Sequence, residues 1–358
     1  VASFVAGIDS RDAEALAALA APDDAAAADL LTGIAGNAAE LDLRQVSARY
    51  VDQVGTVADD GSWTGIVDLT WRIGDLDAAR SRADVAVSFA PDGDALGIAG
   101  FEAASRARVP LWLRGALAVA RADGVLVMVD GSPSEAVAVA ERVTRGRDVV
   151  RRVLGEPDAP VVVEVPASAA DLDEALGAAP GTYAGIAAVT TTAGSPDGPA
   201  APVHVFVNPD VTAGLRRAGA QVVMSHELVH VATDAPRTPM EPWLLEGFAD
   251  YVALRDTRLP DRTTLGRAIA VVRRDGAPDS LPSAADFETR ERDLQARYEE
   301  AWLACRIIAD RLGEQGLVSV YDAAAAGAPV ERVLRRAGLG EDELARAWRA
   351  RLVALARS

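Results

Sequence analysis

The residues best suited to chemistry in this chain are its histidines, of which there are only three. Two of them, His226 and His230, stand four residues apart in the segment HELVH, and Glu227 follows the first. Residues four apart on an α-helix lie on one face, about 6 Å apart along the axis, so both imidazoles can bind one metal ion. Glu227 can then take a proton from a water molecule that the ion has made more acidic. A chance HExxH in a chain of this composition has an expected count on the order of 10⁻³, so the spacing predicts a metal-dependent hydrolytic site.

A catalytic zinc site needs a third protein ligand, and the sequence restricts its type. The chain has one cysteine, and no histidine follows His230, so we expect a carboxylate on the next helix. Glu246 stands sixteen residues after His230, which leaves enough chain for a turn and an antiparallel return. Asp250 lies one helical turn further, where it can accept the outer N–H of a ligating histidine and fix its tautomer. The other acids to be considered as the third ligand are Glu241 and Asp234.

HExxH followed by Glu-x-x-x-Asp resembles the gluzincins, the thermolysin-like and aminopeptidase-N-like zinc metallopeptidases. The closer likeness is to bacterial peptidase-MA-like domains, in which a P-W-L-x-E-G-x-A-D-Y segment follows HExxH, as PWLLEGFADY does here. The likeness covers roughly residues 107–358 and extends to RYEEAWLACRIIADRLGEQGL at 297–317 and to RRAGLGEDELARAWRARL at 335–352. The resemblance implies one Zn²⁺ per chain and hydrolysis of a peptide or protein substrate. Carried over position by position, it implies His226, His230 and Glu246 as metal ligands, Glu227 as general base, Asp250 as an outer partner and Tyr298 as the donor to the oxyanion.

The sequence also departs from the pattern of this family. The catalytic histidine of the thermolysin type is missing, and so is the Gly-Ala-Met-Glu-Asn segment with which aminopeptidases recognise a substrate amine. Tyr251 competes with Tyr298 as the catalytic phenol, although it lies about 100° around the helix from Asp250. The alternative function is that of a metal-binding pseudo-peptidase, which acts as an interaction or ligand-binding protein.

Two further features have structural interpretations, and a third resembles a strand that aligns substrate. The third histidine, His204, alternates with valines along a predicted strand, which favours a solvent-facing or hydrogen-bonded side chain over a catalytic one. Cys305 lies in an apolar helical stripe and is expected to be a core thiol. The segment VHVFVNP at 203–209 looks like the edge strand along which the resembling enzymes align substrate.

Composition excludes several other functions. All 36 basic residues are arginine, which rules out Schiff-base and pyridoxal-phosphate lysines and the lysine of a phosphate-binding loop. The net charge of −17 and the lack of a dense basic run make nucleic acids and anionic lipids poor partners. The most apolar stretch, from Val109 to Val129, is interrupted by charged residues, so no membrane span is expected within this chain.

The first part of the chain predicts a small α+β domain over residues 1–105. Helical periodicity covers residues 1 to about 40, and period-two patterns predict antiparallel strands near 43–54, 62–74, 82–90 and 95–103, with Asp-Asp-Gly and Pro-Asp-Gly turns. Helices followed by a meander of long strands resemble the cone-shaped nuclear-transport-factor-2-like and SnoaL-like domains, whose first helix corresponds to FVAGIDSRDAEALAAL. No constellation of acids, His or Tyr forms a site here, so we expect a scaffold or partner-binding module.

The second part, residues 106–358, predicts a small mixed sheet followed by an all-helical region. Strands are expected at 116–121, 124–130, 160–166, 186–192 and 203–207, with helices at 134–154 and 169–176 between them. After residue 209 only helical periodicity remains, over 210–217, 219–234, 243–256, 261–274, 286–312, 314–326, 328–337 and 341–357. The fold class is therefore α+β, with a cone-like domain followed by a domain of gluzincin type.

The expected location is extracytoplasmic. This rests on the family likeness and on a sequence that begins at Val1 rather than Met, which suggests a secreted form or an N-terminal anchor outside this chain.

Overall fold

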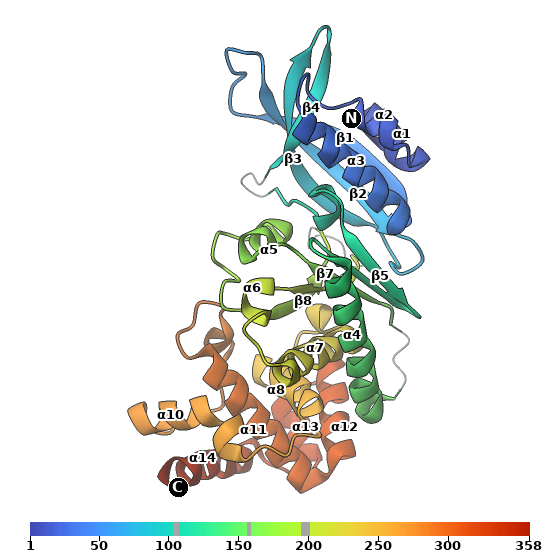
Figure 1. Cartoon of the computed structure of the whole chain (residues 1–358). Helices are drawn as coiled ribbons and strands as arrows, with labels where there is room; N and C mark the ends of the chain where they lie inside the picture. The colour runs from blue at the N-terminus through green and yellow to red at the C-terminus, as the bar shows by residue number, and fades with distance from the viewer. Residues whose placement is uncertain (103–106, 156–158, 195–200) are drawn as a thin grey trace. The chain divides into compact units, whose positions relative to one another are not determined.

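The computed structural model describes residues 1–102, 107–155, 159–194 and 201–358 (Figure 1). The chain is a mixed α/β protein that divides into two compact units. Unit 1 comprises Val1–Arg142 and Ala159–Leu215, and unit 2 comprises Val143–Asp158 and Arg216–Ser358. The two sheets lie in unit 1, whereas the described part of unit 2 is helical.

Unit 1 begins with three helices and a four-stranded antiparallel meander of order β1-β2-β3-β4. In Figure 1 the helices lie across one face of this sheet. The hydrophobic cluster between helices and sheet includes Ile8 and Leu31 of the helices and Val67 and Val85 of the strands. The alternating buried and half-buried positions of β2 explain why period-two patterning predicted these strands. The elements are α1 (Ala2–Ser10), α2 (Ala13–Ala17), α3 (Ala25–Glu40), β1 (Leu43–Val54), β2 (Trp63–Ile73), β3 (Ser81–Asp92) and β4 (Ala95–Glu102).

The second sheet of unit 1 has five strands in the order β5-β6-β7-β9-β8. Strands β6, β7 and β9 run parallel, and β5 and β8 pair antiparallel at the two edges. The prediction that residues 203–209 form an edge strand is therefore wrong, because β9 lies between β7 and β8. Its side chains are mostly buried, as expected of an interior strand. The elements are η1 (Leu111–Leu113), β5 (Ala118–Ala122), β6 (Val125–Val129), α4 (Pro133–Leu154), β7 (Val161–Val165), α5 (Ala169–Leu176), β8 (Ala188–Thr192), β9 (Val203–Val207) and α6 (Pro209–Thr212).

One hydrophobic core serves both sheets of unit 1. Trp71 of β2 meets Trp112 of η1 edge to face at 5.9 Å, and Met128 of β6 and Val162 of β7 belong to the same buried cluster. The predicted boundary between residues 105 and 106 falls within 103–106, outside the described residues, so it stays a prediction.

Unit 2 contains the second half of α4 and the helices after residue 216. The described residues after Asn208 contain no strand, in agreement with the loss of period-two patterning there. The predicted helix at 286–312 divides into a short 3₁₀ turn and a long α-helix, separated by Glu288–Asp293. The elements are α7 (Arg217–Ala232), η2 (Ala235–Arg237), α8 (Pro242–Ala253), α9 (Asp261–Thr264), α10 (Gly266–Asp275), η3 (Ala284–Phe287), α11 (Leu294–Leu312), α12 (Glu314–Ala325), α13 (Val330–Arg336) and α14 (Glu341–Arg357).

Two local features position the helices α8 and α11. Pro242 begins α8, where its missing N–H is one that the first turn would leave unpaired in any case. Gly247 lets α8 approach α11 closely, because a Cβ atom there would lie 2.4 Å from the carbonyl oxygen of Ala301 and 2.9 Å from Sγ of Cys305. Any larger residue at position 247 would separate the two helices.

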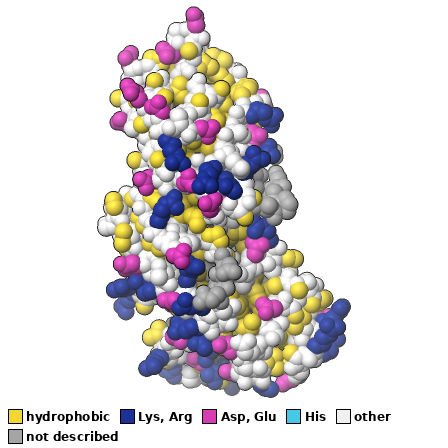
Figure 2. Space-filling model, turned by 90° about the vertical axis from the view of Figure 1, so that its right-hand side faces the viewer, with side chains coloured by type: hydrophobic (Ala, Val, Ile, Leu, Met, Phe, Trp, Pro, Cys, Tyr) yellow, Lys and Arg dark blue, Asp and Glu magenta, His cyan; other side chains and the backbone are white. Residues whose placement is uncertain are grey.

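The described helices include none that is both long and apolar enough to cross a bilayer. On the face that Figure 2 shows, arginine side chains are interspersed with Asp and Glu side chains.

Candidate metal centre

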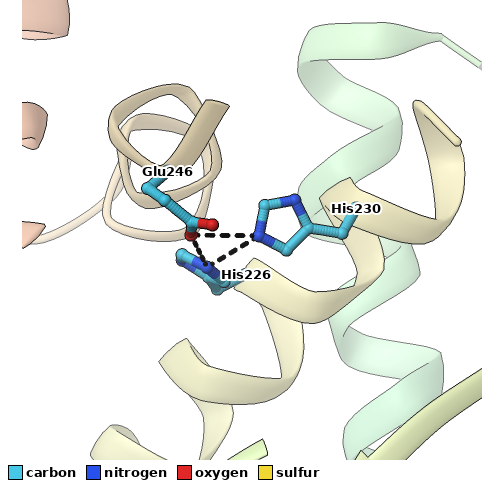
Figure 3. Close-up of side chains that lie close together, drawn as sticks. All are labelled: His226, His230 and Glu246. Atoms are coloured by element: carbon cyan, nitrogen blue, oxygen red, sulfur yellow. Dashed lines mark hydrogen bonds and ion pairs between the residues drawn. The ribbon is translucent and has the colours of Figure 1, made fainter. Parts of the chain in front are cut away.

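Helices α7 and α8 bring three ligand atoms together in unit 2 (Figure 3). Nε2 of His226 lies 3.0 Å from Nε2 of His230, and Oε2 of Glu246 lies 3.1 Å and 3.2 Å from these two nitrogens. Two nitrogens and one oxygen each bonded to zinc at about 2.0–2.2 Å in tetrahedral geometry are separated by about 3.3 Å. The cluster therefore has the donor types and nearly the spacing of a three-ligand zinc site.

Protons alone satisfy this triangle poorly. A proton lies along one edge and joins two atoms, whereas a cation above the centre contacts all three. The side chains of His226, His230 and Glu246 are 12%, 9% and 18% exposed, so the triangle is largely removed from water but still reachable from one side. The donor set consequently fits a zinc ion that keeps an open coordination position.

Asp250 fixes the orientation of the first histidine. Its Oδ1 atom lies 2.8 Å from Nδ1 of His226, on the side of the ring away from the triangle. Accepting Nδ1–H places the lone pair of the neutral imidazole on Nε2, where it faces His230 and Glu246. The structure thus brings Asp250 to the place expected of an outer partner.

The described residues offer no equivalent support to His230. Its Nδ1 atom is buried and has no hydrogen-bond partner in the described part of the chain. The orientation of this ring therefore depends on the backbone of α7 and on packing.

The electrostatics of the cluster favour positive charge at its centre. Burial by itself lowers the pKa of His226, but the carboxylates of Asp250 and Glu246 raise it well above the ordinary value. Burial by itself raises the pKa of Glu246, but the two histidines lower it strongly. Both pKa shifts arise because a negative carboxylate stabilises a positively charged imidazole beside it.

Two further residues of the predicted site lie around the triangle. Glu227 is buried on α7, and Tyr298 of α11 meets the ring of His226 edge to face, with centroids 6.0 Å apart. Burial raises the pKa of Tyr298 well above its usual value, and the charges of Glu246 and Glu227 raise it further. The phenol consequently remains a hydrogen-bond donor at neutral pH.

The alternative residues lie elsewhere. The hydroxyl of Tyr251 donates to Oε2 of Glu314 at 3.3 Å, so this phenol belongs to the α8–α12 surface. Glu241 is exposed at the start of α8, and exposed Asp234 pairs with Arg237. Cys305 is fully buried in α11, as expected of a core thiol, and burial raises its pKa.

The third histidine forms a different centre in unit 1. His204 is 1% exposed, and its Nδ1 and Nε2 atoms lie 2.7 Å from Oε1 of Glu164 and 3.0 Å from Oδ1 of Asp77. Of the two alternatives predicted from the sequence, the hydrogen-bonded side chain is confirmed and the solvent-facing one is wrong. Burial by itself lowers the pKa of His204, but the two carboxylates raise it to about 10.

Sequence reasoning missed one group of residues beside the triangle. Tyr321 of α12 stacks on Phe248 of α8, with ring centroids 4.2 Å apart, and donates a hydrogen bond to Oγ1 of Thr233 at 3.0 Å. No spacing in the sequence connects these positions, because they come from three different helical segments.

The chain matches no protein-family model, no curated protein and no solved structure.

Proposed function

We propose that this chain is a zinc-dependent peptidase whose metal is held by His226, His230 and Glu246. The single observation that carries the proposal is the convergence of their three ligand atoms within 3.0–3.2 Å on two neighbouring helices. Two imidazoles and one carboxylate suit Zn²⁺ better than Mg²⁺ or Ca²⁺, which prefer oxygen ligands. Three protein ligands, rather than four, are typical of a catalytic site.

The bound ion would polarise the scissile carbonyl and acidify a water molecule. Glu227 accepts a proton from the attacking water and later gives it to the leaving amine. Tyr298 donates its hydroxyl proton in a hydrogen bond to the oxygen on which negative charge develops. Asp250 holds His226 in the tautomer that leaves Nε2 free.

The choice of a peptide bond as the substrate rests on the likeness of HELVH and PWLLEGFADY to the gluzincins. The same likeness supports a gluzincin-type arrangement for residues 106–358 and an extracytoplasmic location. For residues 1–105, the helices and antiparallel meander support a nuclear-transport-factor-2-like domain. The competing proposal is a metal-binding pseudo-peptidase, in which the same triangle serves interaction rather than catalysis.

The test combines metal analysis with digestion of a broad peptide library. We expect about one zinc per purified chain and cleavage that a chelator abolishes and zinc restores. Glu227→Gln keeps the three ligands and removes the proton acceptor, so zinc should remain while cleavage falls by several orders of magnitude. Full zinc without cleavage in the parent would favour the pseudo-peptidase, and cleavage that survives Glu227→Gln would place the activity outside this site.

A further inference from the structure

The two histidines of the metal centre are supported in different ways. Nδ1 of His226 meets Asp250 at 2.8 Å, whereas Nδ1 of His230 is buried without a hydrogen-bond partner among the described residues. Metal-binding histidines ordinarily donate their outer N–H to an acceptor that fixes the ring. Something else must therefore hold His230 in place.

Side-chain hydrogen bonds hold the C-terminal end of α7 directly after His230. Oγ1 of Thr233 donates to the carbonyl oxygen of Val229 at 2.9 Å, and the hydroxyl of Tyr321 donates to Oγ1 of Thr233 at 3.0 Å. The hydrogen bonds form a directional chain that ends on the peptide unit joining Val229 to His230. Burial raises the pKa of Tyr321 to about 12, so its hydroxyl keeps its proton at neutral pH.

The same tyrosine also contacts the helix of the third ligand. Its ring stacks on Phe248, with centroids 4.2 Å apart and planes 25° apart, and both side chains are almost completely buried. Phe248 lies on α8 between Glu246 and Asp250. One side chain of α12 thus joins the last turn of α7 to the middle of α8, the two helices that supply all three ligand atoms.

We infer that Tyr321 is a positioning residue of the metal centre: through Thr233 and Phe248 it holds the His230 turn against the helix of Glu246. This inference rests on the proposed metal site and adds to it a residue that does not touch the metal. It explains how His230 is oriented although its Nδ1 atom has no acceptor among the residues that the structure describes.

Tyr321→Phe tests the inference, because it keeps the ring on Phe248 and removes only the hydroxyl. We expect zinc affinity, measured by chelator competition, to fall by about tenfold, at the lower end of the usual effect of an outer partner. The visible absorption spectrum of the Co²⁺-substituted protein should also change, since it reports ligand geometry. Tyr251→Phe, which removes a hydroxyl from the same region but bonded to Glu314, is the matched control and should alter neither measurement.

Thr233→Val makes the test independent of any general loss of stability. It removes both the acceptor of the Tyr321 hydroxyl and the donor to the carbonyl oxygen of Val229 at nearly constant shape, so the double variant with Tyr321→Phe should bind zinc about as tightly as Thr233→Val alone. Effects on zinc affinity that simply add, or an unchanged Co²⁺ spectrum in Tyr321→Phe, would overturn the inference while the metal site stands. A parent protein that binds no zinc would overturn the proposed function as well, so the two failures are distinguishable.

Discussion

Two histidines of this chain lie between two carboxylates each, yet their surroundings support different roles. In unit 1, His204 places one nitrogen against Glu164 and the other against Asp77, so each ring N–H has its own acceptor. In unit 2, His226 uses Nδ1 in the same way but directs Nε2 at both Glu246 and His230. The first arrangement is complete with two protons, and the second is suited to one positive centre that three atoms share.

The difference teaches that a buried histidine beside acids is not by itself a sign of a metal site. What distinguishes the two centres is convergence: the carboxylates around His204 lie on opposite sides of its ring, whereas the ligand atoms around His226 lie on one side. Among the described residues, the triangle of His226, His230 and Glu246 is the group of three such side chains that can hold an ion. A protonated imidazole is therefore expected to stabilise unit 1, and a cation is expected to complete the candidate metal centre of unit 2.

The strongest way to break this comparison is to remove one carboxylate from each centre. Glu246→Ala deletes one of three ligands and should weaken zinc binding on the order of 10³-fold. Glu164→Ala removes a carboxylate that also contacts a histidine, but zinc affinity should stay within about twofold of the parent. Chelator competition measures both. If Glu246→Ala binds zinc as tightly as the parent, the third ligand has been assigned to the wrong acid.

The second largest effect is expected in the stability of unit 1. His204→Gln removes the positive charge between two buried carboxylates and should lower the free energy of unfolding by about 3–5 kcal/mol near pH 6. The folded-state pKa of about 10 lies above the ordinary value of 6.5. The contribution of His204 is therefore fully present below about pH 6.5 and is lost as the pH rises through 10.

Denaturant unfolding of the parent and of His204→Gln at several pH values measures this contribution. The difference in unfolding free energy should be largest near pH 6 and should shrink steadily between pH 6.5 and 10. Titrating groups other than Glu164 and Asp77, the two partners of His204, are common to both proteins and cancel in the difference. A difference in unfolding free energy that stays constant over this range would show that His204 is neutral in the folded protein. Zinc affinity should be the same in the parent and in His204→Gln.

Tyr298 and Tyr251 allow a second comparison, between two phenols of unit 2. Tyr298→Phe should lower kcat by roughly 10²–10³-fold with KM and zinc content nearly unchanged, because its hydroxyl acts mainly on charge that develops in the transition state. Tyr251→Phe should change kcat by less than about threefold, since that hydroxyl bonds to Glu314. Steady-state kinetics on one cleaved peptide decides between them. The reverse ranking would mean that the phenol was assigned to the wrong helix.

Much of the local structure could be predicted from the sequence, because periodicity and turn residues act over short distances. The strand predicted at 203–207 and the helix predicted at 169–176 agree with β9 and α5 in their bounds. The order of strands could not be predicted in the same way. The edge position of residues 203–209 was inferred from a family likeness, whereas pairing with both β7 and β8 depends on chain segments that are distant in the sequence.

In the candidate site, too, contacts between segments close in sequence could be predicted and contacts between distant segments could not. The four-residue spacing of His226 and His230 is a property of one helix, and the return of Glu246 needs only the next helix. The partners of His204 are 40 and 127 residues away, and Tyr321 lies 88 residues after Thr233. Sequence reasoning finds candidate ligands that neighbouring helices supply, but it does not find the supporting contacts that tertiary packing creates.

The smallest of these effects concerns the aspartate in each centre. Asp250→Asn replaces the acceptor of Nδ1–H of His226 by an amide, which orients the ring less well and no longer raises its basicity, so zinc affinity should fall about 10–100-fold. Asp77→Asn makes the same change beside His204 and should leave zinc affinity unaltered while it lowers the stability of unit 1. Isothermal titration with a competing chelator gives the affinity, and denaturant unfolding gives the stability. Unchanged zinc affinity in Asp250→Asn would mean that the 2.8 Å contact with His226 does not tune the metal ligand. The two aspartates would then have the same role, and the difference between the centres would rest on His230 alone.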